Sequence, residues 1–174
     1  MKLGKMALSL ALLIVVAALA SCGGTPAPET YTDSFAYCAA VGTIDAPDAA
    51  YTGPKMPEGV LEALRTALNT PDLPLEMLEN GSFWRCMDGE VYGCFVGANL
   101  PCEAKANTDK TPTQEEIDFC QQNPDSDFIP AVATGRETVY EWRCREGAPE
   151  IVQQVFHPDA QGFISEFWYK IEQE

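Results

Sequence analysis

Residues 82–97, SFWRCMDGEVYGCFVG, are the stretch from which the fold can be predicted most directly. Aromatic and β-branched residues, which favour strands, lie on both sides of Asp88-Gly89, and this dipeptide favours a two-residue hairpin turn. Such a turn pairs Cys86 with Val91 and places Cys86 and Cys94 on opposite faces of the ribbon. A disulfide between these two cysteines would therefore need a bulge.

The same pattern recurs further along the chain. Residues 84–89 read WRCMDG and residues 142–147 read WRCREG, so Trp-Arg-Cys, an acidic residue and a glycine keep their places. Alternation along a strand puts the tryptophan and the cysteine on one face and the arginine on the other. The repeat therefore predicts two similar hairpins, each with a tryptophan packed beside a sulfur.

Other segments share this strand-like composition. Strands are predicted over 82–87, 90–97, 128–133, 137–145, 150–156 and 162–171. The loop 157–162, HPDAQG, is expected to join the last two strands as a hairpin, because proline, aspartate and glycine favour turns.

Three segments have helical signals instead. Residues 57–68 repeat apolar side chains at helical spacing, and residues 71–81 end in Asn-Gly, a common helix stop. Residues 113–123 begin with a capping box of Thr113 and Glu116, which directs Cys120 inward, and Pro124 prevents continuation. Without β-α-β alternation, the pattern predicts an α+β fold, a mainly antiparallel sheet of about five or six strands with two or three peripheral helices.

The N-terminus has the layout of a secretory signal: two lysines, an apolar run over 8–19, and small residues before Cys22. The run is shorter than the about 20 apolar residues that a membrane span needs. Its ending, LASC over 19–22, resembles the lipobox of bacterial lipoproteins. The resemblance implies that residues 1–21 are removed and that lipid on Cys22 anchors the protein to a membrane. An ordinary signal cleaved near Ala20 is the alternative, and it would leave Cys22 as a free thiol.

The rest of the chain divides into a tether and a body. Residues 22–33 are rich in glycine, proline and polar residues, which suits a flexible tether, and residues 34–174 have the length of a single globular domain. Removal of Lys2 and Lys5 with the signal leaves 9 basic against 26 acidic residues, a net charge of −17. This charge excludes nucleic acid as a partner and favours basic proteins or cations, although solubility alone also explains it.

Cysteine content points to an oxidising compartment. Once Cys22 is assigned to lipid, six cysteines remain, an even number suited to three disulfides: Cys38, Cys86, Cys94, Cys102, Cys120 and Cys144. Cys102 with Cys120 is the preferred pair, because it would staple the polar loop 103–112 and the capped helix to the sheet. The other pairings stay open. Since no Cys-x-x-Cys pair occurs, a structural metal is not expected.

Candidate catalytic residues are few. His157, the one histidine, precedes Asp159 and could act as a base oriented by a carboxylate, but no nucleophile motif accompanies it. The acidic pairs Glu115-Glu116, Asp125 with Asp127 and Glu137 with Glu141 could serve a glycosidase, but an acidic chain more often uses them as a solvated face. We therefore predict neither an enzyme nor a cofactor.

Three further features are candidates for binding. Asn123, Asp125 and Asp127 have the spacing that opens a calcium loop, but Phe128 takes the place of the required glycine, and a helix-ending turn explains them. Gly97 and Asn99, in the loop 96–102, tolerate left-handed geometry and predict either a tight disulfide-anchored turn or a binding loop. The arginines at 85, 136 and 143 are expected to neutralise carboxylates across strands rather than to form an anion site.

Residues 83–171 also resemble uncharacterised exported bacterial proteins that carry Trp-Arg-Cys followed by Gly-Ala-Asn-Leu-Pro-Cys. This resemblance implies a secreted single domain and assigns no activity. The expected function is that of a lipid-anchored extracytoplasmic lipoprotein, held on the outer face of the cytoplasmic membrane or on the outer membrane, which binds another extracytoplasmic protein. Inhibition of a basic cell-wall hydrolase is one version of this function. An envelope hydrolase and a cation-binding lipoprotein are the alternatives.

Overall fold

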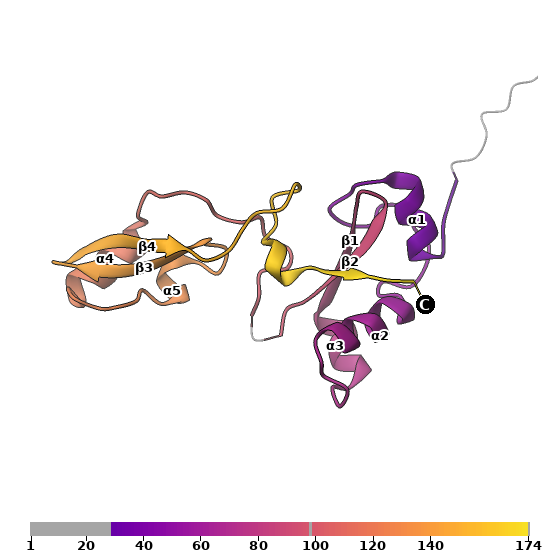
Figure 1. The fold of residues 1–174 in the computed structure, drawn as a ribbon, viewed down its shortest axis with the longest axis horizontal. Helices are drawn as coiled ribbons and strands as arrows, with labels where there is room; N and C mark the ends of the chain where they lie inside the picture. Colours follow the sequence, from indigo (N-terminus) through magenta and orange to yellow (C-terminus); the bar gives the residue numbers. More distant parts are fainter. Residues whose placement is uncertain (1–28, 98, 174) are drawn as a thin grey trace, which may run out of the picture.

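The computed structural model describes residues 29–97 and 99–173, which form two lobes (Figure 1). Both lobes combine helices with antiparallel strands, so the predicted α+β class is confirmed, with the strands divided between a sheet of three and a sheet of two. The lipobox and Cys22 lie outside the described residues. Within the described residues, no helix combines the length and the apolarity that crossing a bilayer requires.

The first lobe is built around the predicted hairpin. Strands β1 (Ser82–Met87), β2 (Glu90–Phe95) and β5 (Tyr169–Ile171) pair antiparallel in the order β1-β2-β5. Cys86 lies opposite Val91, as the turn at Asp88-Gly89 predicted, and both turn residues have positive φ. Helices α1 (Ser34–Val41), α2 (Glu58–Ala67) and α3 (Leu75–Gly81) contribute to the core on the Cys86 face of this sheet.

The second lobe contains the other hairpin. Strands β3 (Tyr140–Arg145) and β4 (Ala148–Gln154) are joined by Glu146-Gly147, again with positive φ at both residues. Helix α4 (Gln114–Gln122) packs against this hairpin, and α5 (Ala131–Thr134) packs against α4. The capping box of Thr113 and Glu116 is confirmed, with the Glu116 carboxylate accepting a hydrogen bond of 2.7 Å from the Thr113 N–H.

Each lobe joins a helix to its hairpin through the cysteine of Trp-Arg-Cys. Cys86 bonds Cys38 of α1, and Cys144 bonds Cys120 of α4. The predicted repeat therefore corresponds to two hairpins with the same turn and the same type of helix-to-strand disulfide. In both hairpins the tryptophan and the cysteine face the core together, Trp84 in the first lobe and Trp142 in the second.

The preferred pairing of Cys102 with Cys120 is wrong. Cys102 bonds Cys94 of β2, only 8 residues away, and this disulfide closes the loop 96–101. The α4 capping box does point Cys120 inward, but the side chain that it meets there is the buried Cys144 of β3. The three disulfides join six of the seven cysteines, which confirms the prediction of three disulfides among the cysteines other than Cys22.

Some predicted strands are also wrong. Residues 128–133 contain Pro130, which begins the short helix α5 instead of continuing a strand. Only the last three residues of 162–171 pair as a strand, and they join β2 rather than β4, so 157–162 is not a hairpin loop. Helix α1 was not predicted because its apolar residues do not follow one face; the Asp33 side chain caps it by accepting from the Ala36 N–H at 2.8 Å.

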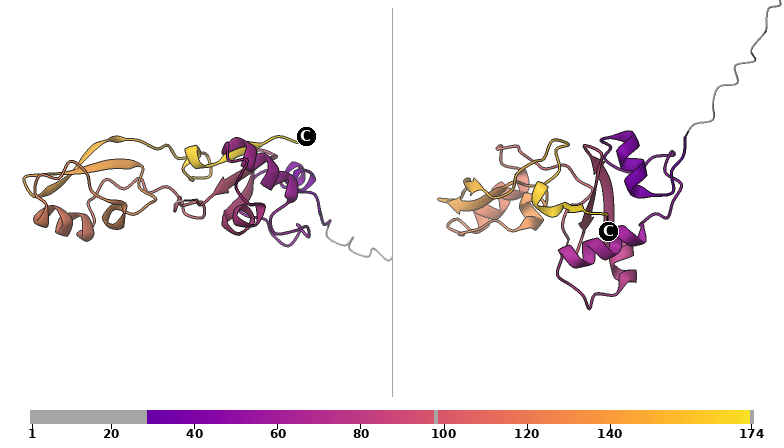
Figure 2. Two further views of the ribbon diagram at one scale, coloured as in Figure 1. Left: turned by 90° about the horizontal axis from the view of Figure 1, so that it is seen from below. Right: turned by 45° about the vertical axis from the view of Figure 1, so that its right-hand side comes forward.

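A third, smaller core joins the lobes. It contains Cys94, Cys102, Phe163 and Trp168, and the turn around Pro158 to Ile164 brings Phe163 onto the first sheet. This segment, with the 3-10 helix η1 (Ser165–Phe167), runs between the lobes in two further views (Figure 2). The single domain predicted for 34–174 stays a prediction.

Arg85 lies at the centre of this joint. Its side chain is 0% exposed, it forms an ion pair with Asp159, and its Nη1 donates to Gln161 Oε1 at 2.8 Å. Its guanidinium carbon lies 4.4 Å from the Phe163 ring centroid and 4.3 Å from that of Trp168. A planar cation suits both rings and both acceptors, so Arg85 attaches the 159–168 segment to β1.

We expect a disulfide that closes a longer loop to stabilise the fold more, with the logarithm of the loop length. Cys38–Cys86 spans 48 residues and Cys94–Cys102 spans 8. Loop entropy predicts a loss of about 4 kcal/mol for C38A/C86A and about 2.5 kcal/mol for C94A/C102A. Urea unfolding under oxidising conditions measures both, and an equal loss would contradict the entropic account.

Replacing Arg85 by methionine is expected to cost about 3–5 kcal/mol, because the Asp159 carboxylate would stay buried without its cation. The variant R85M/D159N should recover part of this loss. The amide introduced at position 159 would keep a side-chain oxygen that accepts from the Gln161 and Phe163 N–H groups, as the Asp159 carboxylate does. Urea unfolding of both variants checks the prediction, and an equally unstable double variant would show that the arginine acts through packing alone.

Candidate functional site

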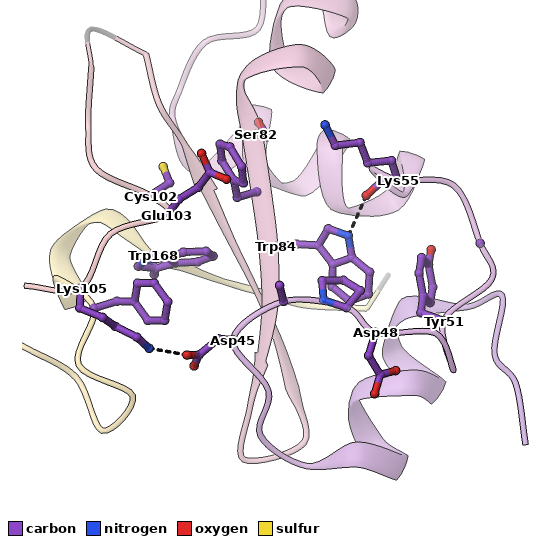
Figure 3. Close-up of a pocket in the computed structure, with 15 residues that line it drawn as sticks. Asp45, Asp48, Tyr51, Lys55, Ser82, Trp84, Cys102, Glu103, Lys105 and Trp168 are labelled. Carbon is purple, nitrogen blue, oxygen red and sulfur yellow. Dashed lines mark hydrogen bonds and ion pairs between the residues drawn. The ribbon is translucent and has the colours of Figure 1, made fainter. Parts of the chain in front are cut away.

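A pocket lies at the outer edge of β1, and we call it the edge pocket (Figure 3). Its volume is about 630 Å³, within the range of pockets that hold ligands. The residues that line it come from four segments: Asp45, Ala46, Pro47, Asp48, Tyr51, Gly53 and Lys55; Ser82, Phe83 and Trp84; Cys102, Glu103 and Lys105; and Phe163 and Trp168.

Two aromatic walls flank the edge of β1. Because side chains alternate along the strand, Trp84 faces one side with Tyr51, and Phe83 faces the other with Phe163 and Trp168. Figure 3 shows Trp84 and Trp168 on opposite sides of the strand. The Trp84 indole N–H donates to the Lys55 carbonyl at 2.9 Å, which holds the ring against the 45–55 segment.

Two buried hydroxyl groups at this pocket have no hydrogen-bond partner among the described residues, those of Ser82 and Tyr51. Ser82 is only 4% exposed, and a buried hydroxyl without a partner costs about 1–3 kcal/mol. Burial, followed by the charge of Asp33, raises the pKa of Tyr51, so this phenol stays protonated and able to donate at neutral pH. Both hydroxyl oxygens are closed to solvent, so they belong to the packing behind the pocket lining rather than to its open surface.

Charged side chains form the rim. The Lys105 ammonium lies 2.6 Å from a carboxylate oxygen of Asp45 and also donates to the Gln161 carbonyl at 2.6 Å. The hydrogen bond from Lys105 lowers the pKa of Asp45 more than partial burial raises it. Asp48 accepts from the Tyr37 hydroxyl at 3.1 Å, and Glu103 is exposed on the opposite wall.

The predicted loop residues lie elsewhere. Gly97 and Asn99 both have positive φ, as predicted, and the Cys94–Cys102 disulfide closes their loop. Asn99 lines a second pocket of about 630 Å³ between the lobes, together with Arg136. A binding role for this loop stays a prediction.

His157 does not meet the carboxylate next to it in sequence. Asp159 is taken by Arg85, and His157 Nδ1 lies 2.8 Å from Glu166 instead. Burial acts to raise the pKa of Glu166, but the hydrogen bonds from the His157 side chain and main chain lower it overall. The His157 side chain is 68% exposed and does not line the edge pocket.

The other predicted candidates have local roles. Glu116 is buried in the capping box, and burial raises its pKa, while Asn123 ends α4. Arg143 pairs with Glu150 on the neighbouring strand at 3.0 Å, which confirms the predicted cross-strand neutralisation for this arginine. Within the described residues, no group of three acidic, histidine or cysteine side chains is placed to hold a metal ion.

The edge pocket was not predicted from the sequence, because Tyr51, Trp84 and Trp168 lie far apart in the chain and share no local pattern. Comparison of the chain with protein families, with curated proteins and with solved structures finds no match in any of the three.

The Lys105–Asp45 contact can be tested by titration. In K105M we expect the midpoint of the Asp45 carboxyl to rise toward its ordinary value of about 3.9, because the main hydrogen bond that lowers it is gone. Carbon-detected NMR titration of the side-chain carboxyls measures it. K110M, which removes a lysine remote from Asp45, should leave the midpoint unchanged. An unchanged midpoint in K105M would show that the ion pair does not persist in solution.

Proposed function

We propose that this protein is a lipid-anchored extracytoplasmic binding module that holds a basic partner protein at the edge pocket. Its three disulfides indicate a non-reducing compartment. The lipobox resemblance of residues 19–22 supports an anchor on Cys22, from which the tether 22–33 would present the body to partners.

One observation carries the proposal: a pocket lined by aromatic side chains opens at a sheet edge whose main chain is unpaired at Ser82 and Trp84 among the described residues. Trp84 and Trp168 line opposite walls, with 4% and 8% of their surface exposed. Rigid aromatic walls of this kind hold an apolar group and exclude water from it.

The charge of the chain favours a basic partner. The net charge is −15 for the full sequence, and the pocket lining carries three carboxylates, Asp45, Asp48 and Glu103, against the two ammonium groups of Lys55 and Lys105. Such a field steers basic proteins toward the surface and repels acidic ones. A basic cell-wall hydrolase such as lysozyme is one partner of this chemistry, and blocking its substrate groove would make the protein an inhibitor.

Crosslinking in intact host cells tests the proposal. The photoreactive amino acid benzoylphenylalanine replaces exposed Pro54, which lies between the pocket-lining Gly53 and Lys55, in the full-length chain, and the adduct with a basic protein is quantified. Ala46 lines the pocket, whereas Ala49 lies in the same loop outside it. We expect A46W, which fills the mouth of the pocket, to lower the adduct at least about tenfold and A49W to leave it unchanged.

Equal adducts in A46W and A49W, or adducts with acidic proteins alone, would overturn the proposal. Lysozyme provides a direct test of the inhibitor version. Unchanged cell-wall lysis at micromolar excess of the purified protein would exclude that version without affecting the binding site itself.

A further inference from the structure

We infer that the edge pocket binds its partner as an added β-strand: an extended, basic segment that hydrogen-bonds to the main chain of Ser82 and Trp84. This inference rests on the proposed function and deepens it, because it names the form in which the partner is recognised. Strand addition to an open sheet edge is a general mode of peptide recognition, in which main-chain bonds supply affinity and side-chain pockets supply specificity.

The hydrogen bonds around β1 show which of its groups point outward. Cys86 donates its N–H to the Ile44 carbonyl at 3.1 Å and accepts from the Ile44 N–H at 3.0 Å, so both of its main-chain groups face away from β2. The carbonyl of Gly81 faces β2 instead, since it accepts from the Val96 N–H at 2.8 Å. Main-chain direction alternates residue by residue in an antiparallel pair.

The same alternation applies to the residues before Cys86. Trp84 and Ser82 have the parity of Cys86, so the N–H and C=O of Trp84 and the C=O of Ser82 point away from β2. No segment within 29–97 or 99–173 pairs with these three groups. Ile44 covers the Cys86 end of the edge, and the chain then continues into the wall of the pocket. An open length of edge therefore lies inside the pocket.

A buried edge of this kind favours a main-chain partner, which matches the spacing of its peptide groups. Ser82 and Trp84 are each only 4% exposed, and orphaned peptide groups in such surroundings are rare. An added strand from the partner, here called the guest strand, would hydrogen-bond to all three peptide groups, because its own peptide groups alternate in the same way as those of β1. A sugar could stack on the tryptophans, but its hydroxyls do not repeat the alternation of a peptide backbone.

The walls define the side chains of the guest. Successive guest residues would alternate between the Tyr51–Trp84 wall and the Phe83–Trp168 wall, because side chains alternate across a strand. Both walls are aromatic, so consecutive apolar residues fit the centre of the guest. Asp48 and Glu103 stand at the rim on opposite sides, and Lys105 is paired with Asp45, so the rim is acidic overall despite Lys55 and suits basic residues flanking the apolar centre.

A peptide with methylated amides tests this inference. Random dodecapeptides displayed on phage are selected against the full-length protein in detergent, with selection repeated on A46W to discard peptides that bind outside the pocket. The best peptide is synthesised together with a series in which one backbone amide at a time is N-methylated. Affinities for the wild type, A46W and A49W are measured by fluorescence anisotropy.

We expect two sensitive amides, two residues apart, because only the carbonyls of Trp84 and Ser82 accept from the guest in either strand direction. Methylation of each should weaken binding about tenfold or more, and methylation of the amide between them should change it less than about threefold. A46W should abolish binding, and A49W should not change it.

Several results would overturn the added strand. These are a methylation series without alternation, the selection of no peptide that depends on Ala46, displacement of the peptide by oligomers of N-acetylglucosamine, or a dimer of the chain that A46W dissociates. If the cellular adduct is lost in A46W while the methylation series is flat, the proposed function stands and the added strand is wrong.

Discussion

The buried guanidinium of Arg85 is the interaction on which the shape of this protein depends. It is held between the rings of Phe163 and Trp168 and paired with Asp159, in a position from which water is excluded. Because a buried charge is costly without a partner, the segment that supplies Asp159 and both rings must stay on β1. That segment returns from the second lobe, so one ion pair orders the joint and builds one wall of the edge pocket.

The two hairpins show how one local pattern serves two purposes. Trp-Arg-Cys and a two-residue turn form the same ribbon in both lobes, and each cysteine bonds a helix on the core side. The arginine faces the other side in both. In the second lobe Arg143 meets solvent and the cross-strand Glu150. In the first lobe the rings of Phe163 and Trp168 cover the equivalent Arg85, so this arginine lies in the core between the lobes instead of on the surface.

The sequence predicted a feature correctly where residues that are neighbours in the chain decide it. The turn at Asp88-Gly89, the register of Cys86, and the capping box of Thr113 depend on a few consecutive residues, and all three were predicted correctly. Predictions failed where distant segments compete. Cys102 had several cysteines within reach by sequence, and the chain beyond Trp168 joined β2 rather than β4. The edge pocket belongs to this second class, because its lining comes from four separate stretches.

By itself, the sequence determined the α+β class, the two hairpins with their inward cysteines, and the oxidising compartment, because each rests on local periodicity, turn chemistry or cysteine content. Tertiary structure alone decided which cysteines pair, which arginine is buried and where the sheet edge stays open. These outcomes depend on which segments pack against one another and exclude water from the surfaces between them. That is a property of segments far apart in the chain, and no window of neighbouring residues contains it.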